Sequence, residues 1–65
     1  SLIRNQIRAR LVNVERVSIS TLIKTLDFAP GNIRAVVAGM IHAGELQLVD
    51  YRPGASDAVV EAKHA

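Results

Sequence analysis

The sequence predicts an α+β domain that is mainly helical, with three helices followed by a short C-terminal β-hairpin. In three separate stretches before Gly44, apolar residues recur at the spacing of three and four that amphipathic helices show. After Gly44 the spacing changes to the alternation of strands, interrupted by a loop of turn-forming residues. With 65 residues and no visible repeat or linker, we expect a single domain over residues 1–65. Because the chain begins at Ser1 without a Met, we expect either a processed chain or an excised fragment of a longer protein.

The composition is that of a globular protein, since 49% of the residues are hydrophobic. Phe28 and Tyr51 are the only aromatic residues, which argues against recognition of single-stranded nucleic acid by base stacking. The chain has no cysteine, which excludes disulfides and thiolate metal sites. No apolar run approaches the ~20 residues of a membrane span, and no signal peptide is visible. We therefore expect a cytoplasmic or nucleoid-associated protein with no membrane partner.

A first amphipathic helix is expected near the N-terminus. Its apolar stripe covers about a quarter of the helix circumference and consists of Ile3, Ile7, Leu11 and Val14. The net charge of +2 is modest, and its basic part gathers here, with four arginines and one glutamate in residues 1–16. Arg4, Arg8 and Arg10 flank the stripe, where they form either a solvated helix edge or an edge that contacts phosphates.

Two further helices are expected before Gly44. Residues 14–19 alternate like a short strand, and Ser20 is expected to be the N-cap of the helix that follows. Its short apolar face consists of Leu22, Ile23 and Leu26. Pro30 suits the first turn of the third helix, and Gly44 suits the left-handed residue just after its end. The core-facing positions of the third helix are Ile33, Val37, Met40 and Ile41.

The C-terminal part is expected to form a hairpin. Leu46, Leu48 and Tyr51 suggest its first strand, with Val49 as the apolar residue on the other face. Residues 52–57 contain Pro, Gly, Ser and Asp and predict a loop. Residues 58–62 (AVVEA) suit a returning strand, and a short helix capped by Ser56 is the alternative.

This order of elements resembles the winged helix-turn-helix superfamily. The resemblance covers residues 19–48, about half of the chain, and indicates no single subfamily. It is carried by residues 19–23 (ISTLI), 26–30 (LDFAP) and 33–37 (IRAVV), with Met40 and residues 44–46 (GEL). It implies a three-helix winged helix-turn-helix fold whose short C-terminal β-hairpin is the wing.

The resemblance also implies a DNA-binding surface, because in DNA-binding members the helix equivalent to residues 30–43 enters the major groove. The positions that would face the groove are Gly31, Asn32, Arg34, Ala35, Ala38 and Gly39. Of these, Arg34 would bond a guanine edge or a phosphate, and Asn32 an adenine edge or a phosphate. The cations expected at phosphates are Lys24, Arg52, Arg4 and Arg8. We therefore expect sequence-specific or semi-specific binding of double-stranded DNA in a prokaryotic or phage-type transcriptional or replication regulator. The few cations predict weak binding per domain and dependence on a dimer.

The small residues of the third helix support an alternative hypothesis. A face made of Ala35, Val36, Ala38 and Gly39 lets another backbone approach closely and leaves a small apolar patch. Such a face suits a protein–protein interaction or dimerisation module without direct DNA readout. An alanine-rich helix with no contact role is the third interpretation.

The sequence contains no pattern of catalytic or metal-binding residues. His42 and His64 are the only histidines, and neither has a second ligand at metal spacing. The glycines form no phosphate-binding loop, and no carboxylate is paired with a nucleophile or a base. We therefore expect a protein that is not an enzyme, with no catalytic residue, metal, cofactor or small-molecule substrate.

Overall fold

Three helices and a three-stranded antiparallel sheet make up the computed structural model, which describes residues 1–49 and 57–63. The elements in chain order are α1 (Leu2–Asn13), β1 (Arg16–Ser18), α2 (Ile19–Thr25), α3 (Pro30–His42), β2 (Leu46–Val49) and β3 (Val59–Ala62). The prediction of a mainly helical α+β fold is confirmed. Residues 58–62 were open between a strand and a short helix, and they contribute strand β3.

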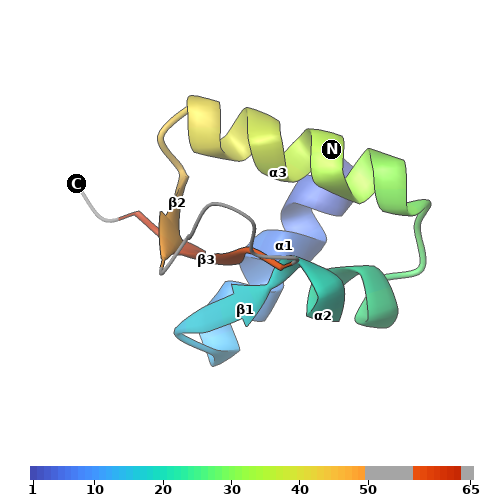
Figure 1. Ribbon diagram of the computed structural model, residues 1–65, viewed down its shortest axis with the longest axis horizontal. Coiled ribbons are helices and arrows are strands. Elements are labelled where there is room, and N and C mark those ends of the chain that lie inside the picture. The colour runs from blue at the N-terminus through green and yellow to red at the C-terminus, as the bar shows by residue number, and fades with distance from the viewer. Residues whose placement is uncertain (50–56, 64–65) are drawn as a thin grey trace.

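The sheet has the strand order β1-β3-β2, so the last strand lies between the other two (Figure 1). Its register places Val60 of β3 opposite both Val17 of β1 and Leu48 of β2. These side chains belong to the inner face, since successive residues of a strand point to opposite faces. On the outer face, Glu61 accepts hydrogen bonds from Arg16 Nε (3.3 Å) and Gln47 Nε2 (2.6 Å). The sheet is therefore apolar toward the helices, and its other face carries this polar cluster beside Val49 and Val59.

The helices cover the inner face of the sheet and pack on one another. In Figure 1, α3 runs along the top, α1 lies behind, and α2 lies below the N-terminal end of α3. Both α1 and α2 contact α3, while α3 also contacts β2 and α1 contacts β3. The buried core draws on every element and consists of Ile7, Val17, Leu22, Leu26, Ile33, Val37, Met40, Leu46 and Val60. The predicted core positions of α2 and α3 are thus confirmed, except that Ile23 and Ile41 are only partly buried.

Helix α2 begins earlier than the sequence predicts, because Ser18 and not Ser20 is its N-cap. The Ser18 backbone is extended, and its Oγ accepts a hydrogen bond from the Thr21 N–H at 3.1 Å. Ser20 lies in the first turn, where its N–H and its hydroxyl both donate to the Asp57 carboxylate. The expected Ser20 cap is therefore wrong, since that hydroxyl has a partner from a distant part of the chain.

Gly44 lies just past the end of α3, as predicted. Gly44 has a φ of +83°, in the left-handed region that glycine enters without steric cost. Its N–H donates to the Ile41 carbonyl (3.0 Å), and the Glu45 N–H donates to the Met40 carbonyl (2.9 Å). This pair of bonds is a Schellman motif, which satisfies carbonyls at the helix end and turns the chain into β2.

Two residues expected on buried faces are exposed. Val14 is 39% exposed because the backbone becomes extended there, which takes its side chain out of the apolar stripe of α1. Leu48 is 44% exposed, although it lies opposite the buried Val60, because β2 is an outer strand of the sheet. Tyr51 and most of the expected loop at residues 52–57 lie outside the described residues. None of the helices in the described part of the chain has the length and apolar character needed to cross a membrane.

Candidate nucleic-acid interface

The face of α3 that the sequence assigns to DNA is turned to solvent. Its six positions, all exposed, are Gly31, Asn32, Arg34, Ala35, Ala38 and Gly39. Helix α2 packs against α3, and residues 26–29 connect the two helices. Since Ile33, Val37 and Met40 point into the core, the helix is held by its apolar stripe and leaves the opposite face free.

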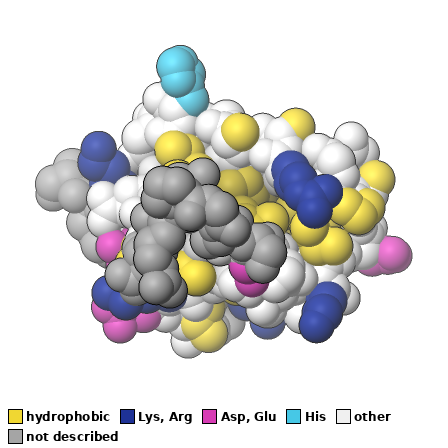
Figure 2. All heavy atoms as spheres, in the orientation of Figure 1, with side chains coloured by type: hydrophobic (Ala, Val, Ile, Leu, Met, Phe, Trp, Pro, Cys, Tyr) yellow, Lys and Arg dark blue, Asp and Glu magenta, His cyan; other side chains and the backbone are white. Residues whose placement is uncertain are grey.

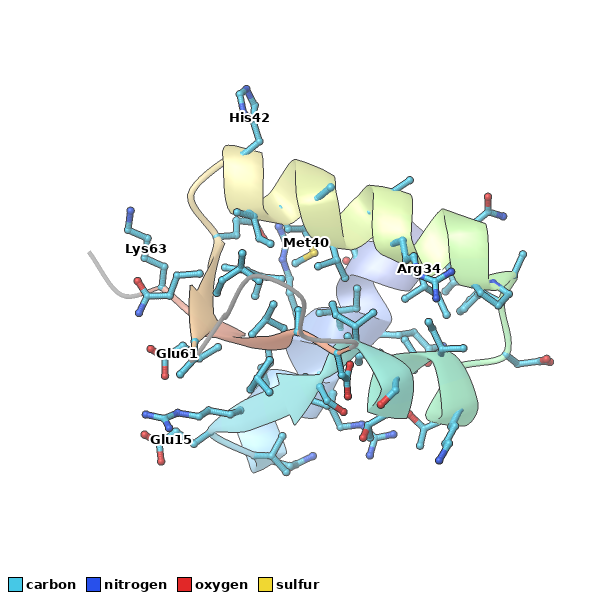
Figure 3. All side chains as sticks on the ribbon, viewed as in Figure 1. Glu15, Arg34, Met40, His42, Glu61 and Lys63 are labelled. Carbon is cyan, nitrogen blue, oxygen red and sulfur yellow. The ribbon has the colours of Figure 1, made fainter. Side chains whose placement is uncertain are left out.

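Arg34 is the only cation on this face. Its side chain is exposed, and within residues 1–49 and 57–63 it has no hydrogen-bond or carboxylate partner. Figure 3 shows the guanidinium projecting from α3 on the side of the helix that faces α2. A guanidinium of this kind has all of its donors available to a phosphate, a guanine edge or a carboxylate.

The N-terminus of α3 has one free backbone donor among the described residues. Ala29 is the N-cap, and it makes no side-chain cap hydrogen bond. The N–H groups of Asn32 and Ile33 both donate to the Ala29 carbonyl, at 3.0 and 3.1 Å. The Gly31 N–H has no acceptor among the described residues. This helix end therefore combines an unpaired donor with the positive end of the helix dipole.

Lys24 contributes the second positive charge near α3. It is exposed in the last turn of α2, and no carboxylate of the described residues pairs with it. Figure 2 shows the cations of this side as separate patches, with apolar and uncharged surface between them. The positive charge is therefore sparse and does not form a continuous basic stripe.

Arg4 and Arg8 of α1, also expected at phosphates, are paired with Glu45. Arg8 donates from Nε to Oε2 (3.0 Å) and from Nη2 to Oε1 (2.7 Å), and Arg4 Nη1 lies 3.9 Å from Oε1. The hydrogen bond from Arg8 lowers the pKa of Glu45 and raises that of Arg8. Glu45 follows the C-terminal end of α3, roughly 15 Å from Arg34 along the helix axis. The structure therefore does not bring the α1 arginines together with Arg34.

The alternative protein-contact face is smaller than the sequence suggested. Ala35, Ala38 and Gly39 are exposed, whereas Val36 is half-buried and packs against the core. Arg52, the remaining expected phosphate contact, lies outside the described residues. What the structure adds is a neighbouring apolar surface that the sequence did not indicate.

This surface is an open hollow of about 350 Å³ beside Arg34. We refer to it below as the α3 hollow, and it is lined by Ile19, Ser20, Ile23, Arg34, Val37, Ala38, Ile41, Leu48, Asp57 and Ala58. Figure 2 shows apolar side chains gathered on this side of the molecule. No pattern in the sequence indicates the hollow as a whole, because its lining residues come from separate elements that meet only in the folded chain. The one available signal was Leu48, whose alternation with Leu46 placed it on the helix-facing side of the sheet.

Asp57 forms the polar end of the α3 hollow. Its carboxylate accepts hydrogen bonds from the Ser20 hydroxyl at 2.7 Å and from the Ser20 N–H at 3.1 Å. These bonds lower the pKa of Asp57. The adjoining Ala58 carbonyl accepts from the Ile19 N–H at 2.8 Å. Together these bonds hold the start of α2 against the segment that leads into β3.

Comparisons with known protein families, curated proteins and solved structures find no match for this chain. Its role is therefore inferred from the geometry of α3 and the residues around it.

Within residues 1–49 and 57–63, no group of three His, Asp or Glu side chains could hold a metal ion. His42 lies at the end of α3 and points away from the body of the molecule (Figure 3). At that position a protonated imidazole interacts favourably with the negative end of the helix dipole.

Proposed function

We propose that the protein binds double-stranded DNA through α3, as a winged-helix domain of a transcriptional or replication regulator. The order of helices and strands supports this proposal, with α2 and α3 as the helix-turn-helix and the β2–β3 hairpin as the wing. In this arrangement α3 enters the major groove. For this role we propose a cytoplasmic or nucleoid-associated location.

The observation that carries the proposal is the free N-terminal half of α3, with an unpaired Arg34 and an uncapped helix start. The unpaired Gly31 N–H and the helix dipole favour a phosphate at the helix end. One turn further, Arg34 reaches outward without a competing carboxylate among the described residues. A bidentate contact of arginine with guanine O6 and N7 is the commonest specific contact in the major groove. Asn32, exposed between them, suits an adenine edge or a phosphate.

The charges predict weak binding by a single domain. Glu45 engages Arg4 and Arg8, so among residues 1–49 and 57–63 the cations left near the free half of α3 are Lys24 and Arg34. Two or three phosphate contacts give a shallow dependence of affinity on salt, with a slope of about −2 to −3 in a plot of log K against log salt. Useful affinity then requires two domains on one duplex, because linking a second binding domain to the first raises the overall affinity.

The test is binding to a mixed-sequence duplex, measured by fluorescence anisotropy over a salt series. We expect binding at low salt that weakens as salt rises, and we expect Arg34→Ala to weaken it about tenfold or more. Lys63→Ala is the matched control, because Lys63 is exposed, unpaired among the described residues, and at the other end of the molecule (Figure 3). No binding at low salt, or equal effects of the two variants, would overturn the proposal.

A second candidate function is a protein contact on the same side of the molecule, favoured by the α3 hollow. Ala38 lies both on the exposed face of α3 and on the edge of the hollow. Under this hypothesis, Ala38→Arg abolishes self-association or a partner contact while the circular dichroism spectrum stays unchanged. Sedimentation of the unmodified chain as a strict monomer, with no recoverable partner, removes the support for this function.

A further inference from the structure

The α3 hollow has an apolar wall that the described residues leave open to solvent. Val37 forms its buried floor, and Ile23 and Ile41 are half-buried along its sides. Leu48 is 44% exposed at its edge, although its neighbour across the sheet is fully buried. The volume of about 350 Å³ falls in the range of small-molecule sites. An apolar chain laid in the hollow would remove this surface from water.

The two charged residues of the α3 hollow differ in availability. Asp57 accepts two hydrogen bonds from Ser20, and these bonds lower its pKa. Arg34 has no partner among the described residues. The hollow therefore offers a free positive group beside an apolar wall and a fixed negative group elsewhere on its lining.

We propose that the α3 hollow binds a small apolar monocarboxylate, of the class of medium-chain fatty acids. The carboxylate pairs with the Arg34 guanidinium, whose two parallel N–H donors match the two carboxylate oxygens. The alkyl chain covers Ile23, Ile41 and Leu48. A second negative group on the ligand is disfavoured, because the Asp57 carboxylate lines the same hollow. An alkyl cation is disfavoured at Arg34 by like charge.

If α3 also binds DNA as proposed above, Arg34 is shared between the two ligands. A bound carboxylate then withdraws the guanidinium that the DNA contact needs, and the two ligands compete. Under the proposed function, the carboxylate acts as a negative effector of DNA binding. The carboxylate site itself does not depend on the DNA hypothesis, and it is tested without DNA.

The experiment is an NMR titration of the intact chain with decanoate, decanol and decylammonium, each below the concentration at which it self-associates. We expect decanoate to shift the methyl signals of Ile23, Ile41 and Leu48. We also expect it to bind about fivefold or more tightly than decylammonium, because only decanoate pairs with Arg34. Equal affinity for decanoate and decylammonium would overturn the proposal, as would shifts confined to methyl groups outside the hollow.

Variants locate the site within the chain. Arg34→Gln should weaken decanoate about fivefold to tenfold and leave decanol unchanged, since it removes the charge and keeps much of the side chain. Ala38→Leu fills part of the hollow and should weaken both compounds. Ala35→Leu, the same change at an exposed α3 position outside the hollow, is its matched control and should weaken neither. Equal effects of the two leucine variants would refute the site, as would an unchanged decanoate affinity in Arg34→Gln.

The two proposals fail separately in these measurements. Decanoate binding in a chain that does not bind DNA removes the proposed function and leaves the carboxylate site intact. If the chain does not bind decanoate but binds DNA in a way that depends on Arg34, the carboxylate site is removed and the proposed function stands. Where both ligands bind, decanoate should release a labelled duplex from the chain, and decanol should not.

Discussion

Replacing Gly44 by alanine should destabilise the protein through the backbone alone. A Cβ built at Gly44 would meet no other atom within 4 Å, so the substitution introduces no clash. The φ of +83° is the source of the cost, because an L-residue in the left-handed conformation loses about 1–2 kcal/mol. Alanine also reduces the conformational entropy of the unfolded chain, which offsets up to about 1 kcal/mol of this loss of stability. We expect a net loss of about 1 kcal/mol.

Gly39→Ala is the matched control, with the opposite expected sign. Gly39 lies inside α3, has no atom within 4 Å of a built Cβ, and is not in the left-handed region. Glycine in a helix interior costs about 0.5–1 kcal/mol relative to alanine. The same chemical change should therefore stabilise the protein at Gly39 and destabilise it at Gly44.

Urea unfolding followed by circular dichroism measures both effects, and thermal unfolding provides a second reading. For a domain of this size, 1 kcal/mol corresponds to roughly 4–8 °C in Tm. Gly44→Asn should fall between the wild type and Gly44→Ala, because asparagine tolerates the left-handed region better than alanine. A neutral Gly44→Ala, or effects of the same sign at Gly39 and Gly44, would refute the conformational explanation.

The remaining predictions concern packing and ionisation. Met40→Ala should cost about 2–5 kcal/mol in urea unfolding, since Met40 is fully buried, whereas Val12→Ala, at a side chain 83% exposed, should change stability by less than about 0.5 kcal/mol. The folded-state pKa of Glu45 is lowered below 4.5 by its hydrogen bond from Arg8, so its contribution is complete above that pH and is lost as the pH falls through the lowered value. Glu45→Gln should therefore reduce the loss of stability as the pH falls below 4.5, and an unchanged pH profile would contradict the pairing. Asp57→Asn should lower the Tm at neutral pH and bring it closer to that of the wild type in acid, because it removes a carboxylate whose pKa is lowered by its hydrogen bonds.

The helices and the hairpin followed from local patterns in the sequence. The apolar stripe of α3 marks its buried face, Pro30 marks its start, and Gly44 marks its end. The bounds of this helix could therefore be predicted closely from the sequence. The exposed face of α3 was predictable for the same reason, because it is the complement of the stripe. That face alone does not identify a partner, since small residues suit DNA, protein or no contact.

The misplaced features depend on residues distant in the sequence. Ser18 and Ser20 are equally good caps by residue type, and what distinguishes them is Asp57, 37 residues from Ser20. The same separation lies between Arg8 and Glu45, so Arg8 looked available for phosphates when only neighbouring residues were considered. The α3 hollow likewise exists only where α2, α3, β2 and the start of β3 meet.

The central position of β3 dictates an order of folding. Arg16 of β1 and Glu61 of β3 pair across 45 residues of sequence, and β2 has the same central strand as its partner. In the observed sheet, β1 and β2 each pair only with β3. The hydrogen-bond ladders of both outer strands therefore form only once β3 is in place. We expect the helices, whose backbone hydrogen bonds are local, to form before the sheet, and we expect the long-range closure of β1 onto β3 to set the pace of folding. A chain caught before that step carries two unpaired strands, and such strands invite association with other chains.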